Sequence, residues 1–109
     1  MTKTRFFHFS QNNSGGSFHE DEDAGLGPEV WVEAHNATEA NNLAESIGIY
    51  FDGVERELDC PCCGNRWYRV WPDNEGYEQP DPDYLYHFRP LAYVHFLDGR
   101  IGTMDFVGR

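Results

Sequence analysis

Residues 29–48 read EVWVEAHNATEANNLAESIG, a strand pattern followed directly by a helix pattern. Side chains alternate in character from Glu29 to Ala34, and this period of two predicts a β-strand. Asn36 follows the strand, and Glu39 lies three residues further on. This spacing is typical of a capping box, in which two side chains satisfy backbone N–H groups at the start of a helix. We therefore expect a helix that begins near Asn36.

The predicted helix has one apolar face. Ala40, Leu43, Ala44 and Ile47 recur at the spacing of one side of a helix, and Gly48 is suited to end it. We expect Leu43 and Ile47 to lie on the buried side of this helix, against a sheet.

Further strand patterns lie on both sides of this unit. The expected strands are Thr4–Phe9, Trp67–Trp71, Tyr84–Phe88, Leu91–Leu97 and Arg100–Phe106, the last two joined by an Asp98-Gly99 hairpin turn. With the strand at residues 29–34 they predict an α+β fold, a single antiparallel sheet of about five or six strands packed on one helix. No change of composition divides the 109 residues, so we expect one domain over residues 1–109.

The chain is strongly acidic. Nineteen Asp and Glu residues face eight Lys and Arg residues, which gives a formal net charge of −11. Such a surface repels phosphate groups and anionic membranes at long range. We therefore expect no general nucleic-acid binding and no membrane partner. The charge suits a basic protein partner, mimicry of a nucleic acid, or simply solubility, and a local arginine cluster would still allow a small anionic ligand.

The sequence favours the reducing cytoplasm. No stretch approaches the roughly 20 apolar residues that span a bilayer, and the apolar run from Phe6 to Phe9 is too short for a signal peptide. All three cysteines lie within four positions. An odd number of cysteines so closely spaced is a poor disulfide framework and a better metal or redox motif.

The cysteines lie in a Cys60-Pro61-Cys62-Cys63-Gly64 turn. Cys60 and Cys63 have the spacing of a zinc knuckle, in which a tight turn directs two thiolates at one ion. Structural zinc takes four ligands, and three completions are open: Cys62, although such a run rarely lets three sulfurs reach one ion; two histidines; or the knuckle of a second protomer. The histidines are His8, His19, His35, His87 and His95. A turn with no metal is the remaining alternative.

Aromatic and arginine residues interleave after this turn. Trp67, Arg69 and Trp71 share one face if the segment is a strand. Together with Arg66, such a face would stack a nucleobase and pair with a phosphate. A polar loop would add backbone N–H groups for an anion. This loop consists of Asn12, Asn13, Ser14, Gly15 and Gly16. Core packing of the tryptophans and an ordinary hairpin turn are the alternatives.

Three segments resemble a family of small uncharacterised bacteriophage proteins. They are residues 9–18 (FSQNNSGGSF), residues 30–48, and residues 50–67, which hold the YFDG and CPCCGNRW motifs. That family has no assigned activity, so the resemblance assigns no site residue. It implies an infected bacterial cytoplasm and an accessory role, such as blocking a host defence by occupying a host protein or by sequestering a nucleotide immune signal.

We therefore expect a non-enzymatic phage protein that counters bacterial immunity by sequestering a small nucleotide-derived signal. Because the global charge opposes such an anion, a pocket shared between protomers is favoured, and with it a homo-oligomer. An acidic inhibitor of a host defence protein, or a nucleic-acid mimic, is the first alternative. A small zinc-stabilised structural or regulatory module is the second. The sequence contains no hydrolase or metalloprotease motif, so no motif indicates that the protein is an enzyme.

Overall fold

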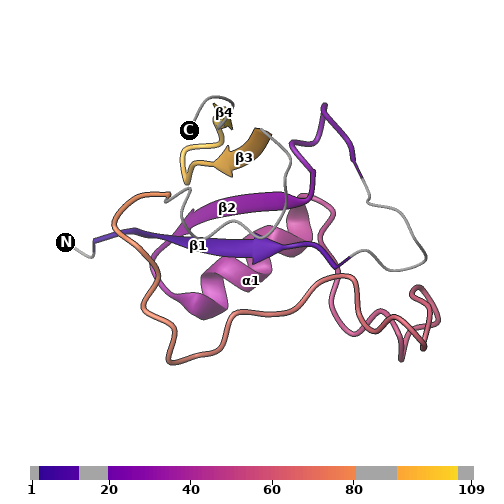
Figure 1. Cartoon of the computed structure of the whole chain (residues 1–109). Helices are drawn as coiled ribbons and strands as arrows, with labels where there is room; N and C mark the ends of the chain where they lie inside the picture. Colours follow the sequence, from indigo (N-terminus) through magenta and orange to yellow (C-terminus); the bar gives the residue numbers. More distant parts are fainter. Residues whose placement is uncertain (1–2, 13–19, 81–90, 106–109) are drawn as a thin grey trace.

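The computed structural model describes residues 3–12, 20–80 and 91–105, and within them the chain forms one helix and four strands (Figure 1). The elements are β1 (Arg5–Ser10), β2 (Glu29–Ala34), α1 (Ala37–Ser46), β3 (Leu91–His95) and β4 (Ile101–Asp105). The predicted α+β class is confirmed, because α1 packs on one face of the sheet.

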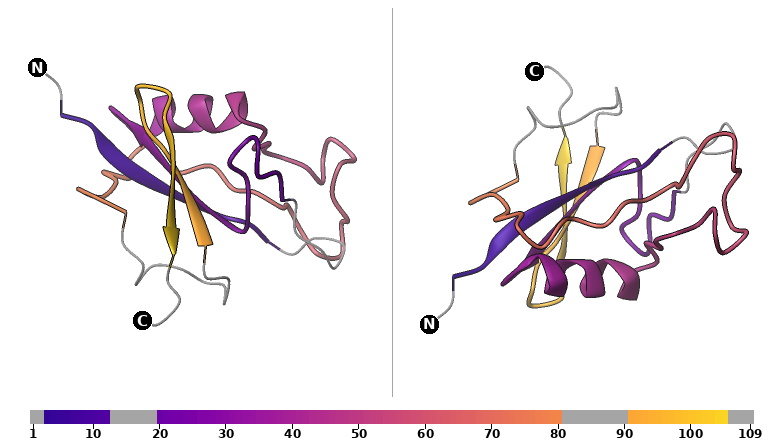
Figure 2. Two further views of the ribbon diagram at one scale, coloured as in Figure 1. Left: turned by 90° about the horizontal axis from the view of Figure 1, so that it is seen from above. Right: turned by 90° about the horizontal axis from the view of Figure 1, so that it is seen from below.

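The four strands form one mixed sheet in the order β1-β2-β3-β4. The pairs β1–β2 and β3–β4 are antiparallel, whereas residues 30–32 of β2 pair in parallel with residues 93–95 of β3. A parallel pair needs a crossover connection, and α1 with the long segment after it provides one. Figure 2 shows the β3–β4 hairpin crossing the β1–β2 pair at an angle, as expected for a twisted sheet.

The prediction of a purely antiparallel sheet with five or six strands is wrong. The segment Trp67–Trp71 joins no strand ladder, and one side chain of α1 binds its backbone instead. Asn41 Nδ2 donates to Val70 O at 3.0 Å, and Val70 N donates to Asn41 Oδ1 at 2.9 Å. The predicted strand Tyr84–Phe88 lies outside the described residues.

Strand β2 is buried on both faces, because each face of the sheet has its own core. The core beneath α1 joins inward side chains of β1 and β2 to the segment that follows the helix. Its larger members are Phe7, Phe9, Val30, Val32, Ile49, Phe51, Trp67 and Val70. The smaller core on the opposite face surrounds Trp31, which meets Tyr77 edge-on with ring centroids 5.5 Å apart. The segment between α1 and β3 therefore covers parts of both faces.

Helix α1 begins where the sequence predicts it. Glu39 N donates to Asn36 Oδ1 at 2.8 Å, and His35 N donates to Glu39 Oε1 at 2.9 Å. Leu43 and Ile47 pack at the rim of the core and are only half-buried. They lie on the predicted side of the helix, but they are less buried than predicted. The fully buried side chains are Ala37, Ala40 and Ala44. Such a seam of small side chains lets the helix backbone lie close to the sheet.

Enlarging the alanine seam should destabilise the fold. Ala40 has no exposed surface, so Ala40→Leu overpacks the core and should lower the free energy of unfolding by about 1–3 kcal/mol. Asn42→Leu adds a similar side chain to the exposed side of the same helix and should change that free energy by less than about 0.5 kcal/mol. Urea denaturation of both variants measures the difference, and equal effects would contradict the packing of α1.

Candidate functional site

Residues 50–72 hold the arginines, tryptophans and cysteines singled out in the sequence, and they form no helix or strand. Local backbone turns and side-chain contacts must therefore position them. Gly53 is required near the start, because a side chain there would overlap the Asp59 carboxylate. Gly53 O accepts from Leu58 N at 2.8 Å and from Asp59 N at 3.0 Å. The YFDG motif thus closes a turn that directs Asp59 into the protein.

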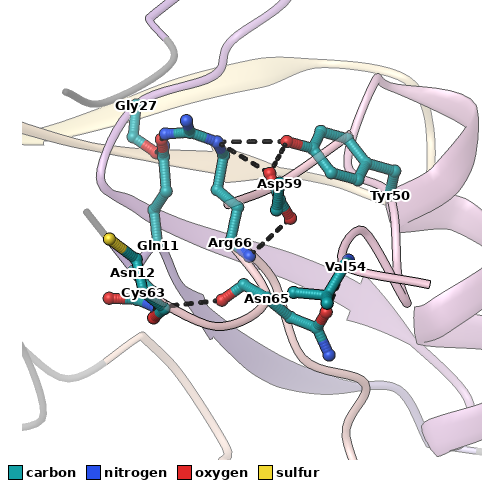
Figure 3. A network of polar contacts seen from close by, with 9 residues as sticks. All are labelled: Gln11, Asn12, Gly27, Tyr50, Val54, Asp59, Cys63, Asn65 and Arg66. Carbon is teal, nitrogen blue, oxygen red and sulfur yellow. Dashed lines mark hydrogen bonds and ion pairs between the residues drawn. The ribbon is translucent and has the colours of Figure 1, made fainter. Parts of the chain in front are cut away.

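Arg66 is the centre of this segment, and its side chain is only 7% exposed (Figure 3). Arg66 Nε donates to Tyr50 Oη at 3.1 Å and lies 3.7 Å from Asp59 Oδ1. Another guanidinium nitrogen donates to Gln11 Oε1 at 2.8 Å. Tyr50 Oη donates to Asp59 Oδ1 at 2.7 Å, and Arg66 N donates to Asp59 Oδ2 at 2.7 Å. We call Gln11, Tyr50, Asp59 and Arg66 the Arg66 cluster.

The Arg66 cluster connects parts of the chain that are distant in sequence. Gln11 Nε2 donates to Gly27 O at 3.1 Å, which extends the network to the loop before β2. Burial, and then the hydrogen bond to Asp59, raise the pKa of Tyr50 above its ordinary value. The structure therefore places Arg66, a predicted ligand residue, among the buried contacts that hold the fold.

Asn12 joins the end of β1 to the cysteine turn. Its Nδ2 donates to Cys63 O at 2.8 Å and to Asn65 O at 3.1 Å, and Asn12 N donates to Arg66 O at 2.7 Å. Asn65 Oδ1 in turn accepts from Val54 N at 2.9 Å. Asn12 was predicted to bind ligand, and its side chain holds the turn in place. The other predicted loop residues, Asn13, Ser14, Gly15 and Gly16, lie outside the described residues.

A pocket of about 540 Å³ lies between α1 and residues 67–72. This volume is in the range of sites for small ligands and cofactors. Thr38 and Asn41 line the pocket from α1. The aromatic and arginine residues that line it are Phe51, Trp67, Tyr68, Arg69 and Trp71. Trp67 is only 1% exposed and belongs to the core, so it forms a buried part of the lining.

Arg69 is a half-exposed charge in this pocket. Its Nη2 lies 2.7 Å from Asp52 Oδ2, and its guanidinium carbon lies 4.9 Å from the centre of the Phe51 ring. The hydrogen bond from Arg69 holds the pKa of the Asp52 carboxyl below its ordinary value. Because both side chains of the pair are exposed to solvent, their attraction is weak. Arg69 can therefore exchange Asp52 for another anion.

The expectation that Trp67, Arg69 and Trp71 share one face of a strand is wrong. Residues 67–71 form no ladder, and their exposure does not alternate: Trp67 is buried, whereas Trp71 is 75% exposed. The three side chains nevertheless line the same pocket. Tyr68, which a strand would direct to the opposite face, lines it as well and is 57% exposed.

The cysteine turn lies at the surface. Cys63 N and Gly64 N both donate to Cys60 O at 3.1 Å, and Gly64 has φ +86°, which glycine adopts without strain. The Sγ atoms of Cys60, Cys62 and Cys63 all lie within 4.8 Å of one another. Cys62 Sγ is 2.6 Å from Cys60 Sγ and 3.7 Å from Cys63 Sγ. The three thiols are therefore close enough to hold one metal ion.

Hydrogen bonds within the turn separate the acidities of two of these thiols. The hydrogen bond from Cys62, and then those from backbone N–H groups, lower the pKa of Cys60. The same contact raises the pKa of Cys62 to about 11. Cys60 therefore becomes a thiolate, the form that binds metals, at lower pH than Cys62.

A buried ionisable pair lies on the sheet face away from α1, and sequence reasoning missed it. His8 Nε2 lies 2.7 Å from Glu29 Oε1, and Ser10 Oγ donates to Glu29 Oε2 at 2.8 Å. His8 also stacks on Trp31 with ring centroids 4.6 Å apart. These residues meet through the β1–β2 register, which sets Ser10 opposite Glu29 and His8 opposite Trp31. The His8–Glu29 pair could have been predicted only from that register, and the sequence of one strand does not reveal its register with another.

The fold and its sites define a small α+β protein with a ligand-sized pocket and a surface cysteine cluster. The chain belongs to a family described as a domain of unknown function (DUF7296), whose model matches residues 4–108. No curated protein and no solved structure matches the chain. Among the described residues, no helix has the length and apolar character needed to cross a bilayer. Membership of an uncharacterised family is thus confirmed, and the bacteriophage origin stays a prediction.

Removing the Arg66 charge should strongly destabilise the protein. Arg66→Met keeps a long apolar side chain but leaves the fully buried Asp59 carboxylate without its ion-pair partner. We expect the free energy of unfolding to fall by about 3–5 kcal/mol. Arg69→Met makes the same chemical change in the exposed pair with Asp52 and should cost less than about 1 kcal/mol. Guanidinium denaturation curves of the two variants test this, and similar losses would show that the Arg66 cluster has no special structural role.

Proposed function

We propose that the chain binds a small ligand of nucleotide type, with a planar ring system and an anionic group, in the pocket between α1 and residues 67–72. The observation that supports this proposal is the lining of that pocket, where Phe51, Trp67, Tyr68 and Trp71 lie around a half-exposed Arg69. A planar ring needs aromatic surface and a phosphate needs an arginine, and this pocket offers both.

Stacking would supply the first part of the binding free energy. Trp71 and Tyr68 are 75% and 57% exposed, so both rings have apolar surface that a ligand can cover. Stacking of a base on an aromatic side chain contributes about 1–3 kcal/mol. Trp67 is only 1% exposed, so it would close the inner side of the pocket and leave stacking to Tyr68 and Trp71.

Arg69 would recognise the anionic group. A guanidinium binds phosphate through two parallel charge-assisted hydrogen bonds, and Arg69 presents its guanidinium beside the pocket. The phosphate must displace the Asp52 carboxylate, which lies 2.7 Å from Arg69. The net charge of −11 slows the approach of any anion. The affinity for the ligand would therefore depend on how well its phosphate competes with the Asp52 carboxylate for Arg69.

This chemistry suits sequestration of a signal without conversion of it. In the setting that the bacteriophage resemblance implies, the protein would remove a nucleotide-derived immune signal from the host cytoplasm. Such a role requires tight binding and no catalytic group. The acidic surface supports the rival function, in which the chain occupies a host defence protein, and the binding test below separates the two.

A zinc-stabilised module is a second candidate function, favoured by the three clustered sulfur atoms. Cys60 and Cys63 would supply the knuckle pair, and zinc bound only by the folded chain would add its binding free energy to stability. The turn also lies close to one residue of the pocket lining, since a side-chain carbon at Gly64 would lie 3.3 Å from the Tyr68 hydroxyl oxygen.

Calorimetry tests the ligand proposal. The panel consists of cyclic dinucleotides, cyclic trinucleotides and ADP-ribose, and we expect saturable binding of at least one of them. Arg69→Ala should weaken that binding about 10- to 100-fold, because it removes hydrogen bonds to a charged group. The matched control is Arg100→Ala, because Arg100 is also exposed, pairs with Asp98 at 2.8 Å and lies 4.6 Å from the Phe96 ring centre.

Two results would contradict the proposal. One is the absence of binding across the whole panel, which would favour the acidic inhibitor. The other is equal weakening by Arg69→Ala and Arg100→Ala, which would show an unspecific effect of charge.

Asp52→Asn should strengthen binding of the phosphorylated ligand. The substitution removes the carboxylate that competes for Arg69, and the residue has φ +58°, a conformation that asparagine tolerates well. Since an exposed ion pair contributes at most about 1 kcal/mol, we expect a gain of about two- to fivefold in affinity. The corresponding nucleoside without phosphate is the control and should show no gain. An unchanged or weaker affinity for the phosphorylated ligand would remove Arg69 from the binding site.

A further inference from the structure

We propose that the cysteine turn is a three-thiolate site for a thiophilic divalent ion such as zinc, in which Cys62 is a full ligand beside Cys60 and Cys63. We propose further that the fourth position of the ion is open to a ligand from solvent. This inference rests on the metal binding proposed above and changes its ligand set. A knuckle formed by Cys60 and Cys63 alone would leave two positions to be filled.

The spacing of the sulfur atoms fits one tetrahedral ion. Bonds of about 2.3 Å from zinc to sulfur place two thiolates of a tetrahedron about 3.8 Å apart. Cys62 Sγ and Cys63 Sγ are already 3.7 Å apart. The 2.6 Å between Cys60 Sγ and Cys62 Sγ must widen, and Cys62 is exposed at the surface. Rotation of the exposed Cys62 side chain can widen this distance.

The backbone of the turn is preorganised for this task. Cys63 N and Gly64 N both donate to Cys60 O at 3.1 Å, which closes the turn that carries the three sulfur atoms. Asn12 Nδ2 holds Cys63 O at 2.8 Å on one side of the turn. Asp59, next to Cys60 in the chain, is fixed by Arg66 on the other side (Figure 3). The base of the turn is thus held while the thiols remain accessible.

The fourth position has no ligand within residues 3–12, 20–80 and 91–105. No His, Asp or Glu of those residues lies with the three sulfur atoms. The histidines among them have other contacts: His8 with Glu29, His35 with Glu39, and His95 with Gly25 O. Three thiolates already outweigh the charge of a divalent ion, so a neutral fourth ligand such as water or imidazole is favoured.

Cobalt(II) titration of the reduced, metal-free protein tests both parts of the proposal. Cobalt occupies zinc sites, and its sulfur-to-metal charge-transfer absorption grows with each thiolate bound. We expect one ion per chain, and a loss of about one third of the intensity in each of Cys60→Ser, Cys62→Ser and Cys63→Ser. Glu57→Gln, an exposed acidic residue near the turn, is the control and should keep the full band. Added imidazole should shift the visible bands of the wild-type complex, because it replaces the solvent ligand.

The other outcomes are distinguishable. If the wild type shows no charge-transfer band, metal binding itself is refuted. If Cys62→Ser keeps the full intensity, the two-cysteine knuckle stands and the three-thiolate site is wrong. If imidazole leaves the spectrum unchanged, the fourth position is closed by a group of the protein and the open site is wrong.

Discussion

The buried charge of Arg66 is the constraint on which the irregular half of the molecule depends. A guanidinium removed from water is strongly destabilising unless its charge and hydrogen bonds are matched. Its partners come from three places, because Gln11 follows β1, Tyr50 follows α1 and Asp59 precedes the cysteine turn. One side chain thus fixes the relative positions of three segments that form no regular structure together. The pocket and the cysteine turn lie on the segment that this charge holds in place.

Arg66 and Arg69 lie three residues apart and occupy opposite environments. Arg66 is 7% exposed in the cluster, whereas Arg69 is 51% exposed beside the pocket. The composition of residues 66–71 led to the prediction of an aromatic and arginine site, and the predicted residues Trp67, Arg69 and Trp71 do line one pocket. The burial of each residue could not be predicted, because the alternating pattern was interpreted as a strand and the segment forms none. The bonds between Asn41 and Val70 hold this backbone outside the sheet, and no local pattern reveals them.

The distinction between local and long-range interactions also explains which parts of the fold could be predicted. Helix α1 and the β3–β4 hairpin could be predicted from sequence, because each depends on residues close together in the chain. These are the capping pair Asn36 and Glu39 for the helix and the Asp98-Gly99 turn for the hairpin. The parallel pairing of β2 with β3 could not, because it depends on the path of the long segment between α1 and β3. The burial of β2 on both faces is a consequence of that path as well. The proximity of Cys62 to the other two thiols likewise depends on the shape of the turn, which Asn12 stabilises from a distant part of the chain.

Native-state amide hydrogen exchange of the wild-type protein tests the central role of the Arg66 cluster most directly. Asn12 N, Val54 N and Arg66 N donate hydrogen bonds within the irregular segment or between it and the end of β1. If the buried charge holds this segment to the sheet, these amides open only with the core. They should then exchange within about tenfold of the rates of the β1–β2 ladder. Exchange of these amides at the rate of an unstructured chain, while the ladder stays protected, would contradict that role.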